Sequence, residues 1–400
     1  MRPDLDQEEL DDEWWNLFTA RRATNWDLSG AKSIGHPALY PWLRVESPGG
    51  VMVFERNPYY FKVDTEGQQL PYVDRVVSFE VSDHEMAMMQ IISGELDFLA
   101  TEVRLRELPM LVQNEERGGY STYVPSMHTV PVAIYPNHTY DDPAWQEVIH
   151  DVRFRKALSM AIDRDELIDT LYYQQAEHPD PQLMDPAVSA FDPEGAEALL
   201  DEIGMTERDS DGYRLSPSGE RFEIYFEVWN RRPDIVPATE LYVAYFQDIG
   251  LRTTMRQISG ELRAQRMNAN ELQISVEYNA LNLMRGGYQT HELLPQVWTN
   301  YGTTWVTWYN TEGREGEEPP EWVKEIHQTV RRIRQAIPGS SEAQAAWDEA
   351  WAWYSEHLPY IFVVDRVSHP FIASTKLGNI PHGGINIAAA MTAEQFFYKE

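Results

Sequence analysis

The first hundred residues alternate between short extended segments and one helical segment. Apolar side chains dominate Val51–Glu55 and Val73–Val81, and both segments predict β-strands. A capping box at Ser82-Asp83-His84-Glu85 predicts a short helix that Gly94 ends. Leu96–Leu99 then resumes a strand. The order strand, short helix, strand predicts a βαβ unit and therefore an α/β lobe.

An aromatic turn separates the first two strands. The segment RNPYYFKVDTEGQQLPYVDRV, residues 56–76, holds Tyr59, Tyr60 and Phe61 ahead of Gly67. Adjacent aromatic rings suit a surface on which a ligand stacks, and they equally suit a turn packed as scaffold. Since Gly67 permits a chain reversal before the second strand, we interpret the three aromatic residues as scaffold.

The clearest helical periodicity runs through residues 151–167. Apolar residues recur there at i, i+3, i+4, i+7 and i+8, while arginine and lysine take the other face, which predicts an amphipathic core helix. Asp163 and Glu166 form a second capping box and predict that a new helix starts at that point. Asp192-Pro193 predicts the start of another helix, which ends at Gly204.

A second group of strands and helices follows. Turn residues such as Asp211-Gly212 and an alternating apolar run predict a hairpin over residues 209–229. A helix over 237–249 and a strand over 251–258 come next, so the segment predicts a second βαβ unit in a second α/β lobe.

The last third of the chain predicts two more helices and a strand. Amphipathic periodicity covers residues 321–336 and 341–357, and the apolar run 361–364 predicts a buried strand. The final forty residues carry few helix signals.

Composition and charge narrow the class of protein. The 400 residues are 42% hydrophobic and 12% aromatic, and no run approaches the ~20 apolar residues of a membrane helix. The net charge of −31 disfavours nucleic acid or an anionic membrane surface as a partner. The absence of cysteine excludes disulfides and thiolate chemistry. Residues 1–13 are acidic and unlike a signal peptide, so either the protein stays inside the cell or its true start is missing.

Enzyme and metal motifs are weak. His84-Glu85 and His291-Glu292 lack the second histidine of a zinc helix, and residues 209–212 resemble a calcium loop without its later ligands. We therefore expect no metal and no cofactor. The sequence has no Gly-x-Ser-x-Gly elbow and no phosphate-binding loop, so an enzymatic function would depend on paired carboxylates among the 64 acids.

Aromatic residues are the positive signal. Tryptophan is frequent, and Trp305, Trp308 and Tyr309 cluster in one segment, with Trp229 and Tyr278 at other loop edges. Such rings stack on sugar faces or pack around peptide side chains, and the alternative is a core cluster. Glu277, at the end of an apolar run, could accept a ligand amine, and the alternative is a surface salt bridge.

Five segments in this order resemble the family-5 extracellular solute-binding proteins, the peptide/nickel-type receptors of ABC importers. They are the aromatic turn, SGELDF, DVRFRKALSMAIDRDEL, DPEGAEALLDEIG with RDSDGYRL, and WYNTEGREGEEPPEWVKEI, and the resemblance starts near residue 14. It implies an α/β, two-lobed, type II periplasmic-binding-protein-like fold. Residues 1–137 would form lobe I, residues 138–358 lobe II, and 359–400 would cross back to lobe I.

The resemblance also implies a site and a departure from the family. The acid before Tyr-Asn that binds a ligand amine in the family corresponds to Glu277, followed by Tyr278 and Asn279. Family members carry an export signal and a long segment ahead of the aromatic turn, whereas only about fifty-five residues precede it here. We therefore expect lobe I to be incomplete.

These observations predict a non-enzymatic, monomeric receptor that captures a peptide or an oligosaccharide. It would deliver the ligand to a membrane permease from the periplasm or the extracellular space. The expected ligand contacts are Trp229, Glu277, Tyr278, Asn279, Trp305, Trp308 and Tyr309. Two alternatives remain: a carbohydrate-active hydrolase with paired carboxylates, and a truncated fragment that binds nothing.

Overall fold

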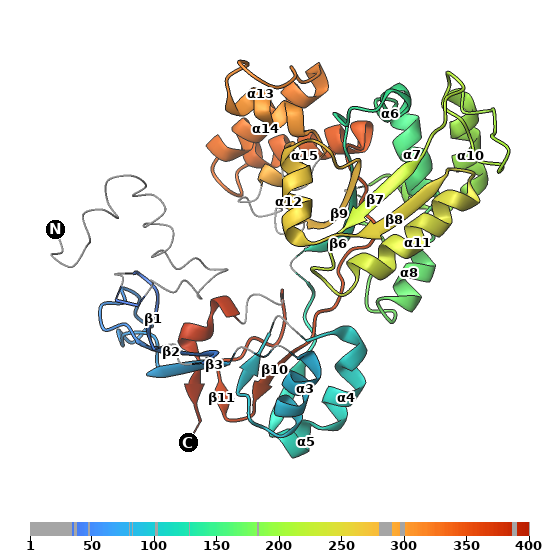
Figure 1. The fold of residues 1–400 in the computed structure, drawn as a ribbon. Helices are drawn as coiled ribbons and strands as arrows, with labels where there is room; N and C mark the ends of the chain where they lie inside the picture. The colour runs from blue at the N-terminus through green and yellow to red at the C-terminus, as the bar shows by residue number, and fades with distance from the viewer. Residues whose placement is uncertain are drawn as a thin grey trace. The chain divides into compact units, whose positions relative to one another are not determined.

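The computed structural model divides the chain into two compact units (Figure 1). Unit 1 comprises Met1–Val103, Glu107–Pro125 and Pro370–Glu400, and unit 2 comprises Arg104–Arg106 and Ser126–His369. The structure describes residues 34–35, 38–46, 49–79, 81, 83–100, 103–127, 129–181, 184–279, 290–296, 301–385 and 390–399. The acidic residues 1–13 and Ser82 of the predicted capping box lie outside these ranges.

Unit 1 begins with an antiparallel sheet in the order β1-β2-β3. Its strands are β1 (Trp42–Glu46), β2 (Val51–Arg56) and β3 (Arg75–Phe79), and the last two are the strands predicted on either side of the aromatic turn. The register Val53↔Val77 and Val51↔Phe79 places apolar side chains of both strands on one face.

The aromatic turn packs through one of its three rings. Tyr60 is buried and donates a hydrogen bond from its hydroxyl to Glu394, whose other carboxylate oxygen lies 2.7 Å from Lys62 Nζ. Tyr59 and Phe61 are exposed. The scaffold prediction is therefore confirmed for Tyr60 and wrong for Tyr59 and Phe61, because Tyr60 is the one ring of the three that is buried against the described part of the C-terminal segment.

A second antiparallel sheet of unit 1 has the order β4-β10-β5 and consists of β4 (Phe98–Leu99), β10 (Phe371–Ser374) and β5 (Tyr120–Tyr123). Helix α3 (His84–Ile92), capped by Asp83, precedes β4 as predicted. The predicted βαβ unit is wrong, however, because β3 and β4 belong to different sheets. Strand β4 instead pairs with a strand from the C-terminal end of the chain.

Short elements complete unit 1. They are η1 (Leu105–Glu107, shared with unit 2), α4 (Leu108–Gln113), α5 (Glu115–Gly118), η4 (Ala393–Gln395), and the paired strands β11 (Leu377–Gly378) and β12 (Phe397–Tyr398).

The central sheet of unit 2 has the order β6-β9-β7-β8. It consists of β6 (Val130–Pro136), β9 (Ile274–Asn279), β7 (Ile224–Val228) and β8 (Thr253–Gln257). β7 is parallel to both β8 and β9, and β6 is antiparallel to β9. Helix α11 (Ile235–Asp248) connects β7 to β8, so the second predicted βαβ unit is confirmed (Figure 1).

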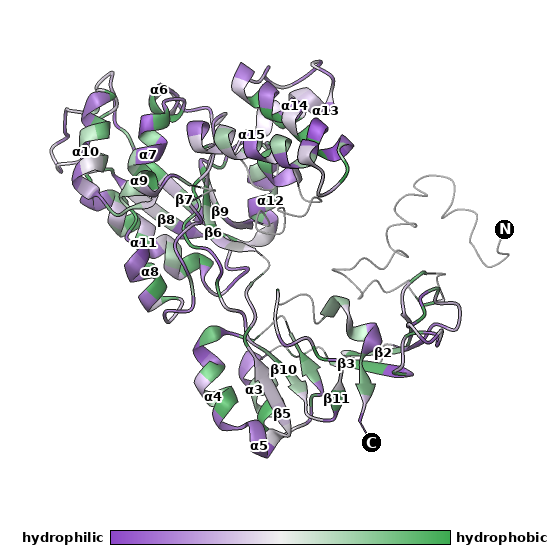
Figure 2. Ribbon diagram, turned by 180° about the vertical axis from the view of Figure 1, so that it is seen from behind, coloured by the Kyte–Doolittle hydropathy of each residue, from purple (hydrophilic) through white to green (hydrophobic). Residues whose placement is uncertain are grey.

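The first helices of unit 2 begin at their predicted caps. Asp163 accepts a hydrogen bond from the backbone of Glu166 at 3.0 Å, and Asp192 accepts one from Gly195 at 2.8 Å. The helices are α6 (Pro143–Ile149), α7 (Val152–Met160), α8 (Arg164–Thr170), α9 (Pro186–Ser189), α10 (Pro193–Glu202) and α12 (Gly260–Asn268). Figure 2 shows hydrophobic and hydrophilic residues alternating along α7 and α10, as the periodicity predicts.

The later helices of unit 2 are η3 (Thr290–Leu293), α13 (Thr303–Asn310), α14 (Glu321–Gln335) and α15 (Ser341–His357). The last two match the predicted helices. Val323, Ile326, Val330 and Ile333 of α14 are buried. This spacing places one stripe of the helix toward the core, where α14 packs against α15.

Two extended segments differ from the prediction. Isolated bridges at Arg208↔Arg214 and Leu215↔Arg221 form two short turns, and the following strand β7 pairs in parallel with β8 and β9 instead of closing a hairpin. Residues 361–364 are buried but form no regular strand, because only Ile361 pairs with β6. The register of β6 shifts just before that point.

Each unit has its own buried core. One large cluster lies within unit 2, and two smaller clusters lie within unit 1. The predicted lobe boundaries at 137/138 and 358/359 stay a prediction. No helix in the described part of the chain has the length and hydropathy that a membrane crossing requires.

Candidate functional site

The carboxyl ends of the parallel strands in unit 2 form the candidate site. Ligands of open α/β sheets bind beyond this edge, where the loops leave the strands. Trp229 directly follows β7, and Glu277, Tyr278 and Asn279 end β9. The structure therefore brings together these four residues, which the sequence predicts as ligand contacts.

Glu277 is a buried acid at this edge, with 2% of its side chain exposed. One carboxylate oxygen lies 3.0 Å from Arg231 Nη2, and the other lies 3.0 Å from Arg263 Nη2. Burial lowers the pKa of the Arg263 guanidinium, and the charge of Glu277 opposes that effect. Both oxygens of Glu277 are thus neutralised by guanidinium groups of the chain itself.

The side chains of Tyr278 and Asn279 donate hydrogen bonds to other residues of unit 2. The Tyr278 hydroxyl donates to one oxygen of Asp234, and the Tyr172 hydroxyl donates to the other at 2.8 Å. Burial raises the pKa of Asp234, and the two hydroxyl donors act in the opposite direction. Asn279 is fully buried and donates from Nδ2 to the Tyr135 hydroxyl at 2.6 Å.

Trp229 is the open aromatic surface of the edge, with 38% of the residue exposed. Its ring packs against Gly260 at the start of α12, where an added Cβ would come within 2.8 Å of the ring atoms. The guanidinium carbon of Arg231 lies 5.8 Å from the ring centroid. The remaining ring surface is available to a ligand.

The other predicted contacts lie on helix α13. Trp305 is 1% exposed, and its ring lies 5.5 Å from that of His138, so no ligand reaches it unless its neighbours move. Tyr309 stacks on His327 with the ring centroids 3.6 Å apart, and Trp308 meets Tyr309 edge to face. A ligand-binding role for Trp305, Trp308 and Tyr309 stays a prediction.

Sequence reasoning missed the arginines of the site. Arg231 and Arg232 lie in the loop that follows β7, and Arg263 reaches Glu277 from α12. A usable signal was present, because two adjacent arginines come directly after a predicted apolar strand. The pairing of Arg263 with Glu277 has no local signal.

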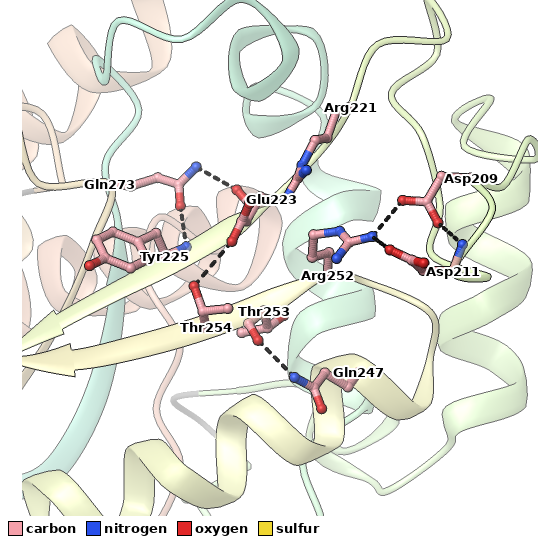
Figure 3. Close-up of polar contacts among 10 residues, drawn as sticks. All are labelled: Asp209, Asp211, Arg221, Glu223, Tyr225, Gln247, Arg252, Thr253, Thr254 and Gln273. Carbon is pink, nitrogen blue, oxygen red and sulfur yellow. Dashed lines mark hydrogen bonds and ion pairs between the residues drawn. The ribbon is translucent and has the colours of Figure 1, made fainter.

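The amino ends of the same strands are closed by internal pairs (Figure 3). Arg252 Nη2 lies 2.8 Å from Asp209 and 2.7 Å from Asp211, and Thr254 donates to Glu223 at 3.2 Å. The two aspartates that resembled a calcium loop therefore hold an arginine. Among the described residues, no group of three or more His, Asp or Glu is placed to hold a metal ion.

A hollow of about 750 Å³ lies at the other end of α12. Its amide groups are already engaged, since Asn270 donates to the Thr139 carbonyl and accepts from Asn137 at 2.8 Å. The hollow is lined by Thr139, Tyr140, Asp141, Gln146, Arg266, Ala269, Asn270, Glu271, Thr304 and Glu317. The strand edge with Trp229 is the better candidate because it combines an exposed aromatic ring with the partly exposed guanidinium group of Arg231.

The candidate site lies within a segment of the chain that matches a known protein family. Residues 42–300 match the family described as bacterial extracellular solute-binding proteins, family 5 Middle. The periplasmic alpha-galactoside-binding protein of Rhizobium meliloti is 25% identical over 298 residues, which cover 69% of this chain and 42% of that protein. A probable ABC transporter-binding protein of Deinococcus radiodurans is 27% identical over 189 residues, 43% of this chain and 31% of that protein.

Solved structures share the fold. An oligopeptide-binding protein, OppA, superposes with a TM-score of 0.68 at 25% identity, covering 100% of this chain and 67% of that one. The periplasmic binding protein MelB of Agrobacterium fabrum, solved with stachyose, gives a TM-score of 0.70 at 20% identity, covering 92% of this chain and 58% of that one. The chain spans less than half the length of the curated relatives it matches.

Proposed function

Because the chain belongs to the bacterial extracellular solute-binding proteins, family 5, we propose that it captures a solute for an ABC importer. The family match over residues 42–300 carries this proposal, since it includes the whole strand edge with Trp229 and Glu277. The family consists of binding proteins and not of enzymes, so the alternative of a hydrolase with paired carboxylates falls away. Glu227 and Glu277, two buried acids of this sheet, are each paired with arginines of the chain.

The proposed ligand is a short peptide or an oligosaccharide. The similar proteins are named for oligopeptides and for alpha-galactosides, and one was solved with stachyose. An exposed tryptophan beside hydrogen-bond donors suits both classes, because the ring covers an apolar or sugar face while the donors bind its polar groups. Trp229 and Arg231 supply this combination.

The proposed mechanism is hinge closure, in which contacts with the ligand stabilise the closed form. The expected location is the periplasm or the extracellular space, and the expected partner is a membrane permease. We expect the receptor to act as a monomer. The lobe bounds remain part of this proposal: residues 1–137 with the return of 359–400 for lobe I, and residues 138–358 for lobe II.

Ligand titration tests the function. The chain is titrated with tri-alanine, pentapeptides, raffinose, stachyose and mannohexaose while tryptophan fluorescence and the melting temperature are followed. We expect saturable binding of at least one compound, with a rise in melting temperature, because a ligand that binds only the folded state stabilises it.

The variant Trp229→Ala is the matched test of the site. It should weaken binding of that compound about tenfold or more, whereas Trp351→Ala on α15 should leave binding unchanged. Silence across the panel in a folded, monomeric sample would contradict the proposal and favour the non-binding fragment.

A further inference from the structure

Unit 1 contains a hollow of about 520 Å³ beside strand β11 (Figure 1). This volume lies within the range of small-molecule sites, roughly 300–1,000 Å³. The described residues that line the hollow come from the end of β5 and from the C-terminal segment, and all of them belong to unit 1. The hollow therefore shares no described residue with the strand edge of unit 2.

One part of the lining is aromatic and apolar. Tyr123 of β5 lines the hollow, and its ring stacks on the buried ring of Phe371 with the centroids 4.8 Å apart. The ring of His382 lies 5.4 Å from that of Tyr123. Ile380, which is buried, adds an aliphatic surface. Because Phe371 packs against the tyrosine ring, this part of the lining is held in a fixed position.

Uncharged polar groups line the same hollow. Asn379 donates from Nδ2 to the Gln395 carbonyl at 2.9 Å, which leaves its Oδ1 atom as an acceptor. The side-chain amide of Gln395 and the hydroxyl of Tyr123 make no hydrogen bond with a described residue. Amide and phenol groups donate as well as accept hydrogen bonds. The hollow therefore offers donors and acceptors together.

The charge of the lining distinguishes between ligand classes. No Asp or Glu is among the described residues that line the hollow, in a chain of net charge −31. Lys399 lines it too, and its Nζ atom donates to the Thr375 carbonyl at 3.0 Å. A ligand amine would therefore find no carboxylate in this lining. An uncharged sugar fits, because its hydroxyls bond with amides while its apolar face packs on an aromatic ring.

We propose that this hollow is a carbohydrate site of unit 1 that binds a neutral mono- or disaccharide. Tyr123 packs on the apolar face of the sugar, and Asn379 and Gln395 bind its hydroxyl groups. The site goes beyond the proposed function, because it uses neither Trp229 nor any other residue of the strand edge. It holds a sugar whether the strand edge takes a peptide or an oligosaccharide.

Ligand-observed NMR on the whole chain tests the site, because saturation transfer detects weak binding of small sugars. The probes are methyl α-galactoside, methyl α-glucoside and sucrose, with tri-alanine as the competitor. At least one sugar should receive saturation at its ring C–H protons, and an excess of tri-alanine should not displace it. Added salt should change the affinity by less than about twofold, because the groups that bind the sugar are uncharged.

Variants assign the signal to the hollow. The double variant Asn379→Ala with Gln395→Ala should weaken binding of that sugar about tenfold, because it removes two hydrogen-bonding groups. Gln113→Ala, which alters an exposed amide on α4 of the same unit, is the matched control and should bind within twofold of the unaltered chain. Trp229→Ala should also leave this affinity unchanged. The melting temperature of each variant verifies its fold.

Each outcome decides. A signal that falls in the double variant and persists in Trp229→Ala supports the site. A signal that falls in Trp229→Ala, in both variants or in neither overturns a separate site in unit 1. Absence of a signal from every sugar also overturns it, and the proposed function then depends on the peptide titration alone. If the double variant fails to fold, Gln395→Ala by itself decides, because that side chain makes no hydrogen bond with a described residue.

Discussion

At the scale of single residues, Glu277 has a different setting in the fold from the one its sequence suggests. The order Glu277-Tyr278-Asn279 predicts that the carboxylate of Glu277 binds a ligand amine. In the fold, Arg231 and Arg263 occupy its two oxygens at 3.0 Å. The amine-binding role stays a prediction, and binding an amine there would require that a buried ion pair open first.

His327 gives a pH prediction at the same scale. It stacks on Tyr309, and burial, with help from Arg334 and Arg331, lowers its pKa to about 4. In the unfolded chain the ring takes up its proton near pH 6.5. As the pH falls, the unfolded state therefore binds the proton first, so this contribution to stability is complete above pH 6.5 and is lost between pH 6.5 and 4.

The expected loss is about 2 kcal/mol, which allows for the partial exposure of the ring. Urea unfolding at pH 7.5, 6, 5 and 4 measures it. His327→Gln should flatten the curve between pH 6.5 and 4, whereas His178→Gln, which alters an exposed histidine, should not. An unchanged slope in His327→Gln would show that this ring is not the source.

At the scale of elements, α11 and α12 cover the sheet through different chemistry. Phe226 and Glu227 are neighbours on β7, so their side chains point to opposite faces. Phe226 meets Phe246 of α11, with ring centroids 6.1 Å apart. Glu227 meets Arg266 of α12 at 2.8 Å, and Glu277 meets Arg263 of the same helix. Ion pairs thus hold α12 against the sheet, whereas apolar contacts hold α11 against its other face.

Because ion pairs hold α12 against the sheet, we expect that removing one of their charges lowers the stability of the fold strongly. Glu277→Gln removes one charge and leaves two guanidinium groups without it, so we expect the free energy of unfolding to fall by about 3 kcal/mol. Glu223→Gln, which changes a glutamate paired with an exposed arginine before β7, should cost less than about 0.5 kcal/mol. Urea unfolding at pH 7 measures the free energy of unfolding of both variants. An equally small decrease in both would contradict the role of Glu277 in holding α12 against the sheet.

At the scale of the whole molecule, the two units have separate cores. The large cluster from Met127 to Val367 lies within unit 2, and the two smaller clusters lie within unit 1. Each core is thus made by residues of its own unit, as in a domain that can fold by itself.

Unit 2 should therefore fold by itself. We expect residues 126–369, expressed alone, to unfold in one cooperative transition and to show dispersed amide resonances. Its Trp305 fluorescence should resemble that of the whole chain because the surrounding rings belong to the same fragment. A molten fragment that binds hydrophobic dyes would contradict this expectation.

Local order was predictable from the sequence. The stripe of Val323, Ile326, Val330 and Ile333, the caps at Asp163 and Asp192, and the β7-α11-β8 unit all follow from repeats of 3.6 or 2 residues and from side chains that bond their own backbone. These rules act over a few residues, so they need no knowledge of the fold.

Only the tertiary structure decided which distant segments meet. It separated β3 from β4 by pairing β4 with β10, left residues 361–364 without a strand, and buried Trp305 under neighbouring rings. It also gave Glu277 two arginine partners. The sequence by itself determined the family, helices α14 and α15, the caps at Asp163 and Asp192, and the β7-α11-β8 unit. The character of the candidate site depended on contacts between residues far apart in the chain, because the charge that a ligand meets is what remains after the chain has paired its own groups.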